Sequence, residues 1–169
     1  MTVKRLIIIN GAMGVGKTTV CRELLKNLPQ CAFLDGDWCW MMDPFIVNEE
    51  TKKMVQDNII HLLRSYLNCS VYKNVVFCWV LHQESILKEL VTQLEDLHFS
   101  LYKITLFCSE QALLLRLEKD VAQGIRQQDV ISRSLERLPL YREMDTVKID
   151  VTSLSPLEAA KKIEALLME

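Results

Sequence analysis

The sequence predicts an α/β protein in which helices cover both faces of a parallel sheet. Short unbroken apolar runs, typical of strands buried on both faces, alternate with stretches of helical spacing along all 169 residues. No repeat, low-complexity stretch or Gly/Pro/Ser-rich linker interrupts this alternation, and half of the residues are hydrophobic. A single domain spanning residues 1–169 is therefore expected.

Five apolar runs are the strand candidates, which makes a sheet of modest size. They lie at residues 5–10, 32–34, 75–80, 101–107 and 147–150. Helical spacing fills the intervals between them. Val20, Leu24 and Leu28, for example, share one face of a helix that follows the first run, and this stripe is expected to pack in the core.

Two longer helices are expected in the middle and the second half of the chain. One covers about residues 48–67, where apolar residues recur at helical spacing. The other covers about residues 129–141 and contains Pro139. Because proline lacks a backbone donor and clashes with the preceding turn, a kink or a stop is expected near Leu138.

The last helix has a clear start signal. Ser155 is a good N-cap residue, Pro156 suits the first helical position, and Glu158 stands three residues after the cap. A helix from this point to about Leu167 is predicted.

A glycine-rich loop lies between the first predicted strand and the first predicted helix. Residues 11–18 match the complete phosphate-binding (Walker A) pattern G-x-x-x-x-G-K-[ST]. Its backbone N–H groups can converge on one anion at the positive end of the helix that follows. Lys17 would reach the β- and γ-phosphates, and the Thr18 hydroxyl would hold Mg²⁺. The residues expected to bind phosphate are Gly11, Ala12, Met13, Gly14, Val15, Gly16, Lys17, Thr18 and Thr19.

Two acids, Asp35 and Asp37, follow the second predicted strand. Parallel sheets bind ligands at the edge formed by the carboxyl ends of their strands, and the glycine-rich loop ends at the same edge. One carboxylate could order the water ligands of Mg²⁺ while the other accepts the proton of an attacking hydroxyl. The alternative is an Asx-turn around Gly36 with no catalytic role.

The next stretch is rich in aromatic and sulfur-containing side chains. It contains Trp38, Trp40, Met41, Met42 and Phe45. These residues could form the wall of an acceptor pocket of mixed apolar and polar character, or they could cover the helix that follows.

A basic stretch in the second half of the chain is arranged like a mobile lid over about residues 117–137. Arg116, Arg126 and Arg133 are the residues expected to meet the triphosphate. The alternative is that these arginines lie on a solvated surface and pair with nearby acids.

Composition excludes several classes of partner. The formal net charge is -2, so no overall basic field attracts nucleic acid or an anionic membrane. No apolar run has the length of a membrane span or a signal peptide. Six scattered cysteines without C-x-x-C pairs indicate free thiols rather than a metal site or a disulfide framework. These observations favour a cytoplasmic protein.

With these features in order, the chain resembles the small P-loop kinases of the nucleoside-monophosphate kinase superfamily. Gluconate, shikimate and antibiotic kinases such as chloramphenicol phosphotransferase have a similar layout. The resemblance covers nearly the whole chain and is carried by residues 11–18, 33–37, 113–126 and 149–152. It implies a three-layer P-loop NTPase fold with a helical lid and a five-stranded parallel sheet ordered 2-3-1-4-5.

The same resemblance implies a function. The family uses ATP with Mg²⁺ and moves the γ-phosphoryl group to a hydroxyl of a small-molecule acceptor. By this resemblance Lys17, Asp37 and Arg126 would be catalytic, with Asp37 as the base, while Thr18 and Asp35 would lie at the metal. A monomer or homodimer is expected.

This sequence departs from the family at three points. No acid follows the third predicted strand, Trp38-Cys39-Trp40 replaces the His-Pro of gluconate kinases, and no arginine follows the acid pair until Arg64. Two alternatives therefore stay open: a nucleotide-binding regulatory or sensing protein without turnover, and a nucleoside-monophosphate kinase. A GTPase is not indicated because no N-K-x-D motif is present.

Overall fold

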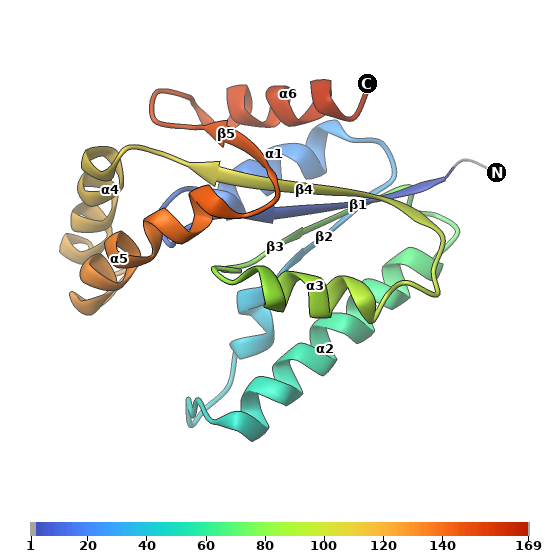
Figure 1. Ribbon diagram of the computed structural model, residues 1–169, viewed down its shortest axis with the longest axis horizontal. Coiled ribbons are helices and arrows are strands. Elements are labelled where there is room, and N and C mark those ends of the chain that lie inside the picture. Colours follow the sequence, from blue (N-terminus) through green and yellow to red (C-terminus); the bar gives the residue numbers. More distant parts are fainter. Residues whose placement is uncertain (1–2, 169) are drawn as a thin grey trace.

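The computed structural model describes residues 3–168, which form one five-stranded parallel sheet (Figure 1). Its order is β2-β3-β1-β4-β5, which confirms the predicted arrangement. All four strand pairs are parallel. The strands are β1 (Lys4–Asn10), β2 (Cys31–Asp35), β3 (Asn74–Cys78), β4 (Phe99–Phe107) and β5 (Val147–Asp150).

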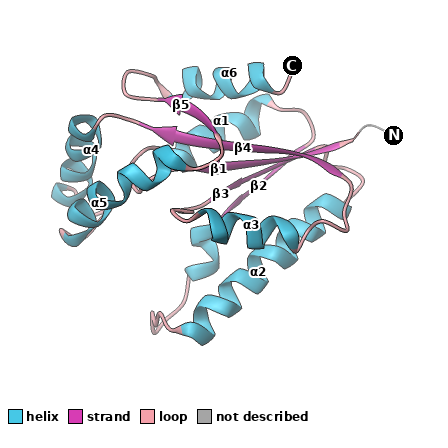
Figure 2. Cartoon of the chain, in the orientation of Figure 1, coloured by secondary structure: helices cyan, strands magenta, loops and turns pink. Residues whose placement is uncertain are grey.

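Helices cover both faces of the sheet, giving three layers. Figure 2 shows α1 and α6 on one side and α2 and α3 on the other, while α4 and α5 lie beyond the end toward which β1 and β4 point. The helices are α1 (Lys17–Asn27), α2 (Glu49–Asn68), α3 (Glu84–Thr92), α4 (Glu110–Ala122), α5 (Asp129–Glu143) and α6 (Pro156–Leu166). A 3₁₀-helix, η1 (Gly36–Trp40), follows β2 directly.

The core is densest around β1, the middle strand of the sheet. Its residues 6–9 are fully buried, since helices cover both of its faces. Val20 and Leu24 of α1 pack on it from one side, and Ile59 and Leu63 of α2 belong to the same core. Burial of this kind is the main favourable term in folding, and it fixes the strand that leads into the glycine-rich loop.

Capping boxes fix the starts of two helices. Asn48 and Thr51 form a capping box at α2, and Ser155 and Glu158 form one at α6, with Pro156 at the first helical position. Both boxes satisfy backbone N–H groups that have no partner within the helix. The predicted start of α6 is thus confirmed, and the helix ends at Leu166.

Two details differ from the prediction. Of the kink or stop expected near Leu138, the stop is wrong, because helix α5 continues past Pro139 to Glu143. Leu138 and Tyr141 are almost fully buried, and this burial compensates for the backbone donor that proline lacks. Strand β3 ends at Cys78 rather than at residue 80, because the Leu81 N–H donates to the Asn10 side chain instead of continuing the strand.

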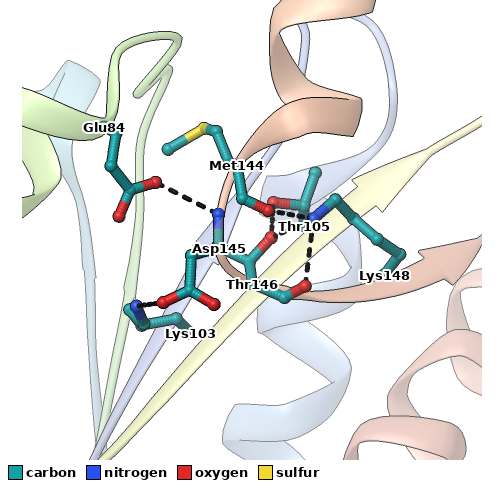
Figure 3. A network of polar contacts seen from close by, with 7 residues as sticks. All are labelled: Glu84, Lys103, Thr105, Met144, Asp145, Thr146 and Lys148. Atoms are coloured by element: carbon teal, nitrogen blue, oxygen red, sulfur yellow. Dashed lines mark hydrogen bonds and ion pairs between the residues drawn. The ribbon is translucent and has the colours of Figure 1, made fainter.

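A polar network fixes the turn between α5 and β5 (Figure 3). The Asp145 N–H donates to Glu84 Oε2 of α3 at 3.2 Å, and the Asp145 carboxylate pairs with Lys103 of β4 at 3.0 Å. The hydroxyls of Thr146 and Thr105 share a hydrogen bond at 2.6 Å. These contacts anchor the carboxyl end of α5 to the sheet, so α5 is held at that end while its other end approaches α4.

Candidate active site

The glycine-rich loop joins β1 to α1 in a conformation that requires glycine. Gly16 caps α1 with φ 104, in the left-handed region that disfavours other residues. At Gly14 a Cβ atom would lie 2.5 Å from the Leu117 side chain, because α4 packs directly against the loop. The loop is therefore shaped by the fold to present its backbone toward one point at the carboxyl edge of the sheet.

Lys17 is buried at the base of this loop. Its Nζ donates to the carbonyl oxygens of Gly11 at 2.8 Å and of Ala12 at 3.0 Å. Burial lowers the pKa of Lys17, and the nearby Cys78, Asp37 and Asp35 oppose this effect. The ammonium group is thus held inside the loop, where its charge is available to an anion bound there.

Asp35 connects the loop to the end of β2. The Thr18 hydroxyl donates to Asp35 Oδ2 at 2.6 Å, and the Asp37 N–H donates to Asp35 Oδ1 at 3.0 Å. Asp35 is therefore both the cap of η1 and the partner of the loop threonine. The Asx-type contact considered from the sequence is present, and it coexists with the contact to the phosphate loop.

Asp37 stands on η1, with part of its side chain open to solvent. Confinement in the cleft raises the pKa of its carboxyl and the neighbouring Asp35 adds to this, whereas Lys17 and Arg126 oppose it. Gly36 before it packs against Trp79, so closely that a Cβ atom would lie 2.5 Å from the indole ring. Trp79 thus fixes the backbone that carries Asp37.

One cleft of about 560 Å³ brings these groups together. Its lining residues come from the loop, from the end of β2 and η1, and from the carboxyl half of α4 with the residues that follow it. Its lining residues include Met13, Gly14, Gly16, Lys17, Thr18, Thr19, Asp35, Asp37, Arg116 and Arg126. The remaining loop residues Gly11, Ala12 and Val15 support it from behind, and Ala12 and Val15 are buried.

The three arginines singled out in the sequence occupy different places. Arg116 lines the cleft, but its guanidinium also donates to the carbonyls of Val15 at 3.0 Å and Val151 at 2.9 Å, which ties α4 to the loop. Arg126 lines the cleft and pairs with Asp120 at 3.0 Å.

Arg133 lies outside the residues that line this cleft. It pairs with Asp129 at 3.3 Å, and its side chain is half-exposed. It borders a separate cavity of about 40 Å³ beneath the loop. Arg126 therefore lines the cleft at the phosphate loop, whereas Arg133 does not.

Several cleft residues were missed by the sequence interpretation. Lys119 and Asp120 of α4, and Gln123 directly after this helix, line the cleft next to Arg116. Their spacing from Arg116 places them on one side of the helix, a pattern that could have indicated a shared face. The packing of Trp79 against Gly36 has no comparable signal, because it depends on how β3 and η1 meet in space.

The two side chains expected at a metal, Thr18 and Asp35, are in direct contact. Thr18 Oγ1 and Asp35 Oδ2 lie side by side at the cleft, and Mg²⁺ prefers one or two such ligands together with water and substrate phosphates. Within residues 3–168 no group of three or more His, Cys, Asp or Glu side chains could hold a metal by itself. The donor set therefore fits Mg²⁺ bound with a phosphate ligand rather than a structural metal.

The sheet order and the glycine-rich loop together define the fold of the P-loop small-molecule kinases. A family model described as an AAA domain matches residues 7–137. Because this match covers well over half of the chain, the protein belongs to that family. No curated protein matches the chain in sequence.

Three solved structures illustrate the likeness. A tunicamycin resistance protein of Deinococcus radiodurans is 22% identical, with a TM-score of 0.71 over 97% of this chain and 95% of that one. A gluconokinase of Sinorhizobium meliloti is 20% identical, with a TM-score of 0.67 over 99% and 92%. A shikimate kinase of Acinetobacter baumannii in complex with shikimate is 21% identical, with a TM-score of 0.67 over 99% and 94%. At these identities the comparison shows a shared fold.

None of the helices within residues 3–168 combines the length and the apolar character that crossing a bilayer needs.

Proposed function

We propose that the protein is an ATP- and Mg²⁺-dependent phosphotransferase that moves the γ-phosphoryl group to a hydroxyl of a small molecule. The observation that carries this proposal is the contact between Thr18 and Asp35, at 2.6 Å. It joins the phosphate loop to the turn that presents Asp37, so that a phosphate and an acceptor hydroxyl can occupy neighbouring parts of one cleft. Positioning of this kind, together with electrostatic stabilisation, supplies most of the catalysis in phosphoryl transfer.

The reaction assigns each group a role. The acceptor oxygen forms a bond to the γ-phosphorus, while the bond from that phosphorus to the bridging oxygen breaks and ADP leaves with the electron pair. The acceptor proton passes to the Asp37 carboxylate. The raised pKa of Asp37 suits a base that must accept this proton.

Positive charge around the transferred group would come from two side chains. Lys17 is held beneath the loop, and Arg126 lines the same cleft on the lid side. Charge that develops on the phosphoryl oxygens is stabilised by groups already placed to meet it. Thr18 and Asp35 would hold Mg²⁺, which neutralises charge on the β- and γ-phosphate oxygens when bound.

The variant Asp37→Asn tests the proposed base. Loss of a general base is expected to lower ADP release with an acceptor by roughly two to four orders of magnitude, with ATP still bound in calorimetry. Glu89→Gln is the control, because Glu89 is an exposed acid on helix α3. Unchanged turnover in Asp37→Asn would remove Asp37 from the mechanism.

One observation favours a second function. The residues after β3 are Trp79, Val80 and Leu81, so no acid stands where P-loop kinases carry a second metal ligand. A protein that binds nucleotide for sensing, without turnover, needs no such acid. ATP binding without ADP release, across sugars, nucleosides, nucleotides and antibiotics with hydroxyl groups, would support this alternative.

A further inference from the structure

The connection that follows Asp37 exposes an unusual amount of apolar surface. We call it the acceptor surface and define it by Trp38, Met41, Phe45, Ile46 and Val47. Met41 is 84% exposed, Phe45 65% and Trp38 47%, and the other two are about half exposed. Five exposed apolar side chains within ten residues are unusual on a protein surface, and exposed apolar surface that is concentrated in one place often marks a binding site.

The acceptor surface begins at the proposed base. Trp38 follows Asp37 directly and packs edge-on against Phe33 of β2, with ring centroids 5.1 Å apart. Trp40 and Phe45 pack at 5.9 Å, which ties the loop after η1 back to the 3₁₀-helix. Figure 1 shows this connection leaving the carboxyl edge of the sheet and reaching α2 with no other element over it. The acceptor surface thus starts one residue after Asp37, which lines the cleft.

The charges along this connection are all negative. Residues 36–51 contain no lysine or arginine, whereas acids stand at Asp37, Asp43, Glu49 and Glu50, beside Asp35. A carboxylate or phosphate on the acceptor would meet repulsion here, because like charges oppose each other and no cation of this segment pairs with them.

The nearest basic residues further along the chain are already paired. Lys52 binds Glu49 at 2.8 Å and Lys53 binds Asp57 at 2.6 Å. Arg64 makes two hydrogen bonds to Asp96, at 2.7 and 2.5 Å, on the side of α2 that meets α3. In the cleft itself, Lys17 and Arg126 are assigned to the transferred phosphate. Arg116 and Lys119 line the cleft from α4, beside the phosphate loop. The connection between η1 and α2 therefore offers an anionic acceptor no cation of its own.

We infer that the acceptor is an uncharged hydroxyl compound with an aromatic or otherwise apolar body, and that this body binds the acceptor surface while the hydroxyl reaches Asp37. The inference rests on the proposed phosphotransferase function and names its class of substrate. Aromatic side chains and methionine suit such a body, since both adapt to flat apolar groups. The acids beside them select against anionic alcohols.

Three matched probes test the inference. 4-Nitrophenyl β-D-glucoside is an uncharged alcohol with an aromatic body, glucose lacks the body, and 4-nitrophenyl β-D-glucuronide adds a carboxylate to it. Calorimetry with Mg²⁺ and a non-hydrolysable ATP analogue measures the affinities. The aryl glucoside is expected to bind at least about tenfold more tightly than either of the other two.

Two variants locate the site. Met41→Ser is expected to weaken binding of the aryl glucoside by roughly fivefold or more, because it removes apolar contact area. Met168→Ser is the matched control, since Met168 is also 84% exposed but follows α6, and α6 and α2 lie on opposite sides of the sheet (Figure 1). ATP affinity is expected to be unchanged in both, because neither residue lines the cleft.

The inference is overturned if the glucuronide or glucose binds as well as the aryl glucoside, if none of the three binds, or if Met41→Ser has no effect. It is also overturned if sedimentation shows that Met41→Ser separates a dimer while affinity stays the same, because a second copy would then cover the surface. Failure of the proposed function has a different signature: the aryl glucoside binds and responds to Met41→Ser, but no ADP is released with any acceptor.

Discussion

The phosphate loop and the connection between η1 and α2 meet at Asp35 and Asp37, and the protein builds them in contrasting ways. On the loop side Lys17 is buried and bonded to two loop carbonyls, and α4 presses against Gly14. On the other side Met41 and Phe45 project into solvent. A loop fixed in this way suits a ligand that is the same in every reaction, such as a triphosphate, whereas the exposed connection is free to differ with the acceptor.

The largest effect is expected from removing the positive charge of Lys17 from the phosphate loop. Lys17→Ala should lower phosphoryl transfer by roughly three orders of magnitude or more and weaken ATP binding, because the loop then lacks its only ammonium group. Calorimetry with ATP and ADP-release assays measure the two effects. Lys161→Ala, at an exposed position on α6, is the control. Undiminished ATP affinity in Lys17→Ala would show that the phosphate site lies elsewhere.

The second prediction concerns the contact that joins the two sides. Thr18→Ala removes the hydroxyl that donates to Asp35 and is expected to lower turnover by about 10- to 100-fold, with a higher Mg²⁺ concentration needed for half-maximal rate. Thr18→Ser keeps the hydroxyl and should restore most of the rate. Equal Mg²⁺ dependence in Thr18→Ala and the parent protein would contradict the assigned metal site.

A third prediction tests how the turn carrying Asp37 is held. In Gly36→Ala the new Cβ would lie 2.5 Å from the Trp79 ring, so the free energy of unfolding should fall by about 1–3 kcal/mol in urea denaturation. ADP release should fall as well, because Asp37 moves with the turn. Gly124→Ala is the comparison: its surroundings are open and its φ is 71, so any cost there comes from backbone strain.

Together these sites show what the sequence could and could not reveal. The glycine-rich pattern and the Ser155 capping box are local patterns, so both could be interpreted from the sequence alone. The strand order followed from resemblance to a family. The course of α5 through Pro139 and the early end of β3 depend on tertiary contacts, namely burial of Tyr141 and the hydrogen bond from Leu81 to Asn10.

Arg116 and Arg133 illustrate the same limit at the site. Both look alike in sequence, as arginines of a basic stretch. In the structure Arg116 is bound to the backbone of the loop and of the chain after β5, whereas Arg133 pairs with Asp129 one helical turn away. Only the packing of α4 against the loop, which no local pattern encodes, separates them.

The smallest expected effect is a shift in the pH dependence of kcat/KM. This shift tests whether the charge of Arg126, on the lid side of the cleft, acts on Asp37. A base accepts a proton only when ionised, so kcat/KM should fall as the pH falls through the pKa of Asp37 in the folded protein. Confinement in the cleft and the neighbouring Asp35 raise that pKa, so this acid limb should lie at higher pH than for an ordinary aspartate.

Arg126→Met removes one of the two cations that oppose the raised pKa, and it should move the acid limb to still higher pH. Arg133→Met is the control, because Arg133 lies outside the cleft. A carboxyl whose pKa rises on folding disfavours the folded state once it is ionised, so Asp37→Asn should unfold slightly less readily than the parent at neutral pH. If the acid limb stays in place in Arg126→Met, the charge on the lid does not reach the proposed base, and the two sides of the cleft work independently.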